Sequence, residues 1–394
     1  MPGFTDTFRD LAAFSGQGLS YSTPSNTAVK MLDALLNQAI YHYNDEQLGG
    51  WAGTAQKMFE ADPDFAMGKI FTLGLECFAT NREKSAEPRK KLFDLSNQSK
   101  TLNLTNLEKM HLKAAELMAS EDYYGAMVTF EDIMAQYPLD AYALHMAYFL
   151  ALTTGHTSRL RDTPASVVKE YKPGMPFYGH VHGKLCFGQG EMGDYEASEI
   201  SGRLALDHFP LDNWAHHALA HNFEESGRAL QGSKFLMNSE PEWKQGENFS
   251  HHIWWHSALF YVQLGEFESA LTLYDDTIGP MTLKGNNLKT LDFYNQTMLD
   301  GGPFALTDGS SLLMRLQLEG VDIGDRAREQ AEMWEDHDED FVSLFSDGHT
   351  CFTNLMAGNT AENAKWMDNF RDYIKGDRKV FWVILPWISL SNTL

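Results

Sequence analysis

The chain has 394 residues, of which 43% are hydrophobic and 12% aromatic, enough for one large repeat array or two to three ordinary domains. Its formal net charge of −23 disfavours binding to nucleic acids and to anionic membranes, because an acidic surface repels phosphate groups. Its three cysteines are widely spaced and no apolar run reaches the length of a membrane span, so we expect a cytoplasmic protein without a disulfide framework.

The chain divides into an irregular start, a long series of helix pairs and an apolar end. Residues 1–26 are rich in Gly, Ser, Thr and Pro and are expected to be irregular. Residues 27–378 carry the helix pairs, with an irregular insertion at about 279–308 that is rich in Gly, Pro and Asn. Residues 379–394 form an apolar tail, too short to span a membrane, that favours a docked segment or a homodimer contact.

The helix pairs have the layout of tetratricopeptide repeats. Residues 178–210 read as a first helix, a turn at Gly193-Asp194-Tyr195, and a second helix that ends before Pro210. The junctions at 137–140 (YPLD) and 209–212 (FPLD) are 72 residues apart, which is the length of two repeats. The sequence therefore predicts an all-α fold, a superhelical solenoid of tetratricopeptide-like helix pairs.

Several stretches resemble the tetratricopeptide repeat protein 38 family. They are WAHHALAHNFEESGRALQG (214–232), HHIWWHSALFYVQLGEFESALTLYD (251–275), SSLLMRLQLEGVDIGDR (310–326) and FSDGHTCFTNLMAG (345–358), together with Trp51 and 62–68. The resemblance covers about residues 50–360 and implies an α-helical repeat fold. It implies no particular activity. The chain departs from the family pattern near its end, where another helix pair is expected after residue 382.

Histidines recur once per repeat. His111, His145, His180, His217 and His252 are separated by 34, 35, 37 and 35 residues, and the strings at 216–221 and 251–256 both read H-H-x-x-x-H. The first helices of such an array line its concave face, and the 3.6-residue helical period turns most of these histidines toward that groove. The remaining members, His216 and His251, are better placed for packing between helices.

The candidate catalytic residues are those that the repeat brings toward one point. Side chains four apart on a helix share a face, so His217 and His221 converge, and the next first helix repeats the spacing. The candidates are His217, His221, Glu224, His252, Asp347 and His349. Candidate ligand-binding residues around them are His145, His180, Trp214, Trp254, Trp255, His256 and Arg315.

Three interpretations of this cluster stay open. In the first, the cluster binds a divalent metal, Zn, Mn or Fe, with His217, His221, His252 and Glu224 as candidate ligands. In the second, it is a general acid–base site with tryptophan walls that binds a small molecule. In the third interpretation the histidines are polar fillers between packed helices. Arg315 is similarly open: it either pairs with a carboxylate such as Asp308 or binds an anionic ligand group.

The function that these residues favour is that of a small-molecule enzyme, or a ligand-binding protein, with a His/Glu/Trp-lined site inside the superhelix. An enzyme of this kind would be a hydrolase or lyase that uses acid–base or metal-assisted chemistry. The alternative is a protein-interaction scaffold that binds a peptide or a partner helix in the groove. Histidine and tryptophan suit a closed pocket better than the Asn, Lys and Arg with which ordinary tetratricopeptide arrays hold peptides.

Overall fold

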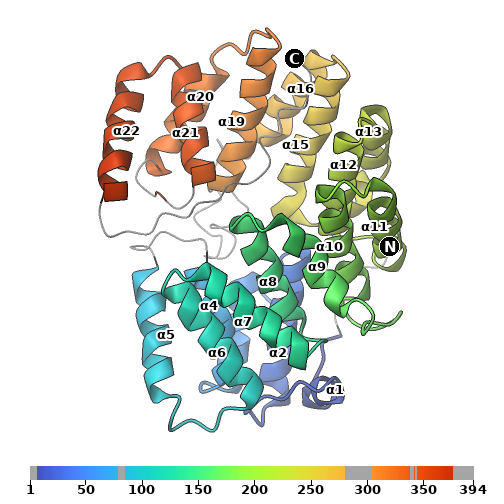
Figure 1. Ribbon diagram of the computed structural model, residues 1–394, viewed down its shortest axis with the longest axis vertical. Helices are drawn as coiled ribbons and strands as arrows, with labels where there is room; N and C mark the ends of the chain where they lie inside the picture. Colours follow the sequence, from blue (N-terminus) through green and yellow to red (C-terminus); the bar gives the residue numbers. More distant parts are fainter. Residues whose placement is uncertain (1–6, 79–84, 280–302, 338–340, 342–343, 376–394) are drawn as a thin grey trace. The chain divides into compact units, whose positions relative to one another are not determined.

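The computed structural model describes residues 7–78, 85–279, 303–337, 341 and 344–375 (Figure 1). Every regular element in these ranges is helical and none is a strand, which confirms the predicted all-α fold. The superhelical path of a solenoid stays a prediction. No helix in the described part of the chain is long and apolar enough to cross a membrane. The apolar tail at 379–394 and most of the expected insertion at 279–308 lie outside the described residues.

Contacts along the chain divide it into two compact units, whereas the sequence predicted one continuous array. The first unit holds residues 1–152, 156–222 and 242–247, and the second holds 153–155, 223–241 and 248–394. The division falls inside helix α12 (Asn213–Glu225), after residue 222.

The first unit is built from consecutive helices of one to four turns. They are α1 (Leu11–Gly16), α2 (Asn26–Tyr41), α3 (Gly50–Ala61), α4 (Ala66–Cys77), α5 (Ala86–Gln98), α6 (Asn106–Ala119), α7 (Tyr123–Gln136), α8 (Ala141–Thr153), α9 (Thr157–Val167), α10 (Tyr178–Glu191), α11 (Tyr195–His208), most of α12, and the short α14 (Glu240–Trp243). Helix α1 lies within the segment that the sequence suggested to be irregular.

Helices next to each other in the sequence pack in pairs in this unit, as α2 does with α3. The pairs of α6 with α7 and of α10 with α11 can be followed in Figure 1. The pair predicted for residues 178–210 is α10 and α11. Gly193 joins them with φ 79°, a conformation that favours glycine, and the Asp194 side chain caps α11 by accepting from the Ala197 N–H. Local turn chemistry therefore sets the pairing that the repeat pattern indicated.

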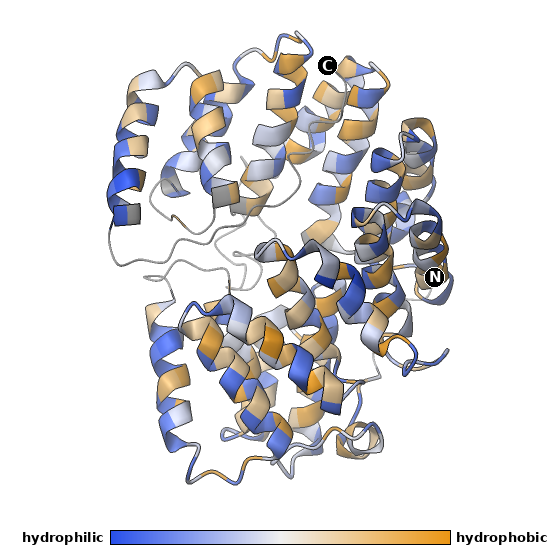
Figure 2. Ribbon diagram, in the orientation of Figure 1, coloured by the Kyte–Doolittle hydropathy of each residue, from blue (hydrophilic) through white to orange (hydrophobic). Residues whose placement is uncertain are grey.

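Two kinds of helix contribute to the core of the first unit. Helices such as α6 and α7 carry polar and apolar residues together (Figure 2) and bury one face. Helix α8 is buried on every side from Ala141 to Ala151. A helix that is buried all round forms the centre of a core, so His145 of α8 lies deep in the unit.

The two proline junctions end in aspartates that tie one repeat to the next. Asp140 accepts the Ala143 N–H at the start of α8 and the Nε2 of His111 from α6, at 2.9 and 2.8 Å. Asp212 accepts the Ala215 N–H at the start of α12, and its other oxygen lies 3.2 Å from the Nδ1 of His180 on α10. His111 and His180 thus hold the caps of following first helices.

The second unit contains the end of α12 and the following helices. They are α13 (Ala229–Asn238), α15 (Glu247–Gln263), α16 (Phe267–Leu273), the π-helical turn η1 (Tyr274–Ile278), α19 (Pro303–Leu318), α20 (Arg326–Trp334), the 3₁₀ turn η3 (Glu335–His337), α21 (Leu344–Met356) and α22 (Thr360–Lys375). Its core joins α15, α16 and α19 through side chains such as Trp255, Leu259, Leu271 and Leu312. Helix α19 begins inside the range where the sequence suggested an insertion.

Candidate functional site

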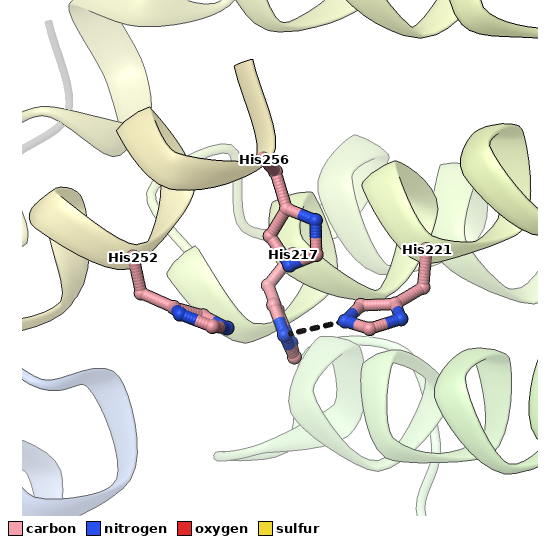
Figure 3. Close-up of side chains that lie close together, drawn as sticks. All are labelled: His217, His221, His252 and His256. Carbon is pink, nitrogen blue, oxygen red and sulfur yellow. Dashed lines mark hydrogen bonds between the residues drawn. The ribbon is translucent and has the colours of Figure 1, made fainter. Parts of the chain in front are cut away.

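His217 and His221 lie one turn apart on α12 and meet through their ring nitrogens. Their Nε2 atoms are 3.0 Å apart, and both side chains are buried (Figure 3). The His217 ring stacks on Phe187 with an angle of 16° between the planes, and it contacts Trp214 as well. At 3.0 Å the two imidazoles share one proton, with one nitrogen donating and the other accepting.

The second nitrogen of His221 faces a carboxylate. Its Nδ1 lies 3.9 Å from Oε1 of Glu191, the last residue of α10, and both side chains are at most 7% exposed. This distance exceeds that of a hydrogen bond but allows an electrostatic attraction in a buried setting. The His221 ring therefore has the Glu191 carboxylate on its Nδ1 side and the hydrogen bond with His217 on its Nε2 side.

His252 is held by Asp308 in the second unit. Its Nδ1 lies 3.0 Å from each carboxylate oxygen of Asp308, so the imidazole N–H donates to a bifurcated acceptor. The ring also stacks on Trp255 at an interplanar angle of 13°. Asp308 Oδ2 also lies 3.4 Å from the Nε2 of His251, so a single buried carboxylate lies next to two neighbouring histidine rings.

His256 repeats this arrangement one turn further along α15. Its Nδ1 donates to Oε2 of Glu224, at 3.2 Å. Burial lowers the pKa of His256, and the hydrogen bond to Glu224 partly opposes that effect. The sequence placed Glu224 beside His221, three residues earlier on the same helix, but the Glu224 carboxylate accepts a hydrogen bond from His256, 32 residues away.

Four buried histidines, His217, His221, His252 and His256, form a group that could hold a metal ion (Figure 3). The His217–His221 pair fits such a role. Two nitrogens bound to one tetrahedral zinc, each about 2.0–2.1 Å from it, lie about 3.3 Å apart, close to the separation of the two Nε2 atoms. His252 and His256 also donate Nδ1–H to a carboxylate, as histidines that bind a metal through Nε2 commonly do.

The remaining residues from the sequence analysis have varied surroundings. His145 is 3% exposed and its pKa lies well below its usual range because of burial. His180 is bound to the capping Asp212 and is therefore engaged in structure. Trp214 is buried against Tyr148, Phe149 and Phe187.

In the second unit the predicted residues gather near Asp308. Trp255 belongs to the core, and Trp254 packs against it. The Arg315 guanidinium lies 5.6 Å from the Trp255 ring centre, and its Nη1 donates to the Ser311 carbonyl and hydroxyl. Burial lowers the pKa of Arg315, while Glu224 and Asp308 favour its charged form.

Helix α21 carries the last two predicted catalytic residues. The Nδ1 of His349 is 2.7 Å from the Phe345 carbonyl, one turn earlier on the same helix, and so donates to it. Burial lowers the pKa of His349, and the Phe345 carbonyl opposes that shift. Asp347 is 6% exposed. The backbone bond leaves His349 with only its Nε2 for any chemistry.

Lys184 is the functional candidate that the sequence analysis did not identify. It lies on α10, four residues after His180, and is 0% exposed. The spacing is the one that joins His217 to His221 and His252 to His256, so Lys184 takes the second position of the pair in its repeat. The recurrence of that pair along the chain was the signal that could have found it.

A comparison with models of known protein families finds no match for this chain. Chemically, the described site offers buried imidazoles whose protonation and orientation are set by carboxylates, together with aromatic walls. Such a set can bind a metal ion or transfer protons.

Proposed function

We propose that the protein is a metal-dependent enzyme or binding protein for a small molecule, in which histidine Nε2 atoms bind one divalent transition metal. The proposed ligands are His217, His221, His252 and His256. The observation that carries the proposal is the carboxylate bonded to the Nδ1 of two of these rings, Asp308 to His252 and Glu224 to His256. In protein metal sites a ligating histidine donates its other N–H to such a group, which fixes the tautomer and strengthens the ligand.

The ligand set favours particular metals. Imidazole nitrogens suit zinc, iron, copper and nickel, whereas manganese prefers oxygen ligands. Among Zn, Mn and Fe, an all-histidine set therefore favours zinc and iron. Glu224, a ligand candidate by sequence, bonds to the Nδ1 of His256, so we assign it to orient that ring.

Burial of the site supports a small ligand over a peptide. All four histidines are at most 5% exposed, whereas a groove that holds a peptide must present its recognition residues to solvent. A metal ion here that keeps one coordination position open, or adds a fifth, would polarise a carbonyl or activate a bound water, as hydrolases and lyases require. Phe187 and Trp214 would supply flat apolar walls beside His217.

A second function has its own supporting observation. The bond between the Nε2 atoms of His217 and His221 passes a proton between two rings, and the His252–Asp308 and His256–Glu224 bonds are dyads of the kind used in general acid–base catalysis. These bonds operate without a metal, so metal-free proton transfer is the competing function. A scaffold for partner proteins is the further alternative.

Metal analysis of protein purified without a histidine tag tests the proposal. After incubation with Zn²⁺ or Fe²⁺ and removal of excess, we expect about one metal ion per chain, with four nitrogen ligands at about 2.0–2.1 Å by X-ray absorption for zinc. His217→Ala and His252→Ala should each lose the metal. His208→Ala, which changes an exposed histidine of α11, is the matched control and should keep it.

Two outcomes would favour the competing functions. Sub-stoichiometric metal in the wild-type chain, with no change of thermal stability on chelation, would leave acid–base transfer as the better assignment. Recovery of a stoichiometric protein partner that competes with small ligands would instead favour the scaffold.

A further inference from the structure

Lys184 is a buried lysine whose amine has no hydrogen-bond or ion-pair partner among the described residues. Its side chain is 0% exposed. Lysine is almost never fully buried unless it is paired. The hydrogen bond or ion pair that normally stabilises a buried amine is thus missing at Lys184. Buried ionisable groups without such a partner are often functional residues.

Aromatic rings surround the amine. Nζ lies 4.1 Å from the ring centre of Tyr148, 4.6 Å from that of Phe149 and 5.1 Å from that of Trp214. The faces of these rings attract a cation, but they accept no hydrogen bond of ordinary strength. They therefore exclude water from Nζ without replacing its hydrogen bonds.

Burial in this cage lowers the pKa of Lys184 to about 7, and the carboxylate of Asp212 only partly opposes the shift. A large fraction of the amine is then neutral near pH 7, with its lone pair free to attack an electrophile. Nucleophilic lysines are activated in the same way, by desolvation in an apolar pocket.

Two histidines with open nitrogens lie in the same interior. His145 Nδ1 and His180 Nε2 are buried and make no hydrogen bond among the described residues. They are close enough to the lysine that its charge lowers the pKa of each. The interior of the first unit thus combines a desolvated amine with imidazoles that can carry protons.

We propose that Lys184 is a nucleophilic lysine that forms a Schiff base with a small uncharged aldehyde or ketone. The neutral amine attacks the carbonyl carbon, and one of its two nitrogen protons passes to the carbonyl oxygen to give a neutral carbinolamine. An imidazole accepts the second nitrogen proton and passes it to the hydroxyl group, which leaves as water while the C=N bond forms. Atoms balance as amine plus carbonyl compound giving imine plus water, and no oxidant or reductant takes part.

The chemistry of the cage selects the ligand. Tyr148, Phe149 and Trp214 offer apolar and aromatic surface, which favours an uncharged carbonyl compound over a carboxylate or phosphate. Carbinolamine dehydration needs a proton carrier, and His145, the imidazole of α8 that burial keeps neutral by lowering its pKa, can take the nitrogen proton and pass it to the hydroxyl group. All these residues belong to the first unit, so the inference stands independently of the metal proposal.

Reductive trapping tests the inference on the full-length protein. Native protein is incubated at pH 7 with propanal and sodium cyanoborohydride, and the alkylated lysines are located by peptide mass spectrometry. An amine of pKa 7 is about half neutral at this pH, whereas an ordinary lysine amine is neutral in about one molecule in 2,500. We expect Lys184 to be alkylated at least about tenfold faster than Lys109, an exposed lysine that serves as internal reference.

The pH profile and two variants complete the test. The alkylation rate at Lys184 should level off above pH 7, while that at Lys109 should keep rising about tenfold per pH unit. Lys184→Met should lose the fast product, and His145→Phe should slow it. Absence of label at Lys184 in the native chain, or label there only after unfolding in urea, would overturn the inference. The wild-type peptide map decides this even where a variant fails to fold.

Discussion

His252 presents its Nδ1 to both carboxylate oxygens of Asp308, at 3.0 Å each, across 56 residues of sequence. The bond fixes which nitrogen carries the proton and directs Nε2 the other way. Asp308 is 4% exposed, so its charge acts on His252 with little screening by water. A histidine held in this way is prepared to ligate a metal or to accept a proton at Nε2.

Replacement of Asp308 by Asn should weaken metal binding without removing a proposed ligand. The amide can no longer hold His252 by a charged bifurcated bond, and it can present its own N–H to the ring. Loss of such an outer carboxylate costs about 10- to 100-fold in metal affinity, which competition with a chelator of known affinity would measure. The control is Asp368→Asn, at an exposed ion pair of α22. Equal zinc affinity in Asp308→Asn and wild type would remove the orienting role.

Replacement of Asp140 by Ala should destabilise the first unit by about 2–4 kcal/mol. The change removes the cap of α8, about 1 kcal/mol, and leaves the buried His111 without its partner, about 1–3 kcal/mol. Asp122→Ala is the matched control. It removes an exposed cap, that of α7, with no histidine attached, and should cost about 1 kcal/mol. Equal losses in the two variants, measured by urea unfolding, would show that the histidine bond contributes nothing.

Much of the fold could be predicted because its signals are local. Glycines at turns and prolines at junctions mark where several helices end, as Gly193 and Pro210 do at α10 and α11. The aspartate that closes the junction at 209–212 was also visible. Its bond to His180 was not, since 32 residues separate the two and only the packing of α10 against the start of α12 brings them together.

The site was less predictable, because spacing along one helix does not identify the partners of a side chain. His217 and His221 meet as their four-residue spacing indicates. Glu224 fits the same rule relative to His221, yet bonds to His256. Asp308 lies 56 residues from His252, and no periodicity relates them. The regular histidine column therefore contains members with different partners, which only the tertiary structure separates.

The stability of the protein should fall as the pH drops below 6.5, and His42 should contribute to this. Burial lowers the pKa of His42 from 6.5 to about 3, Lys184 and His180 add to the shift, and Asp212 opposes it. The folded chain then binds this proton less readily than the unfolded chain. The contribution of His42 to the free energy of unfolding is therefore fully present above pH 6.5 and is lost as the pH falls toward 3. About 2 kcal/mol of it is lost at pH 5.

Urea unfolding at pH 7, 6, 5 and 4 would measure this effect. In His42→Asn the loss between pH 7 and 5 should be about 2 kcal/mol smaller than in wild type. Asparagine is chosen because residue 42 has φ 55°, a conformation that asparagine tolerates. Parallel pH profiles for the two proteins would show that His42 is protonated equally in the folded and unfolded chains.

Replacement of Lys184 by Met should stabilise the protein at pH 7. The pKa of Lys184 falls from 10.5 to about 7 on folding. Its contribution to stability is therefore complete above pH 10.5 and is lost as the pH drops through 7. At 1.36 kcal/mol per pKa unit, this shift lowers the free energy of unfolding of the wild-type chain by up to about 4 kcal/mol at pH 7. Methionine has a similar volume and no charge, so the Lys184→Met variant avoids this loss.

The pH dependence separates this cause from better packing. A gain that comes from the charge should shrink between pH 7 and pH 10, because removing the amine proton on folding costs less free energy as the pH approaches the unfolded pKa of 10.5. Lys109→Met, at an exposed position of α6, should change stability by no more than about 0.5 kcal/mol at either pH. A Lys184→Met variant less stable than wild type at pH 7 would mean that the contacts of Nζ with Tyr148, Phe149 and Trp214 outweigh its desolvation. A stabilised variant that no longer traps propanal would show instead that the chain sacrifices stability to keep a reactive amine.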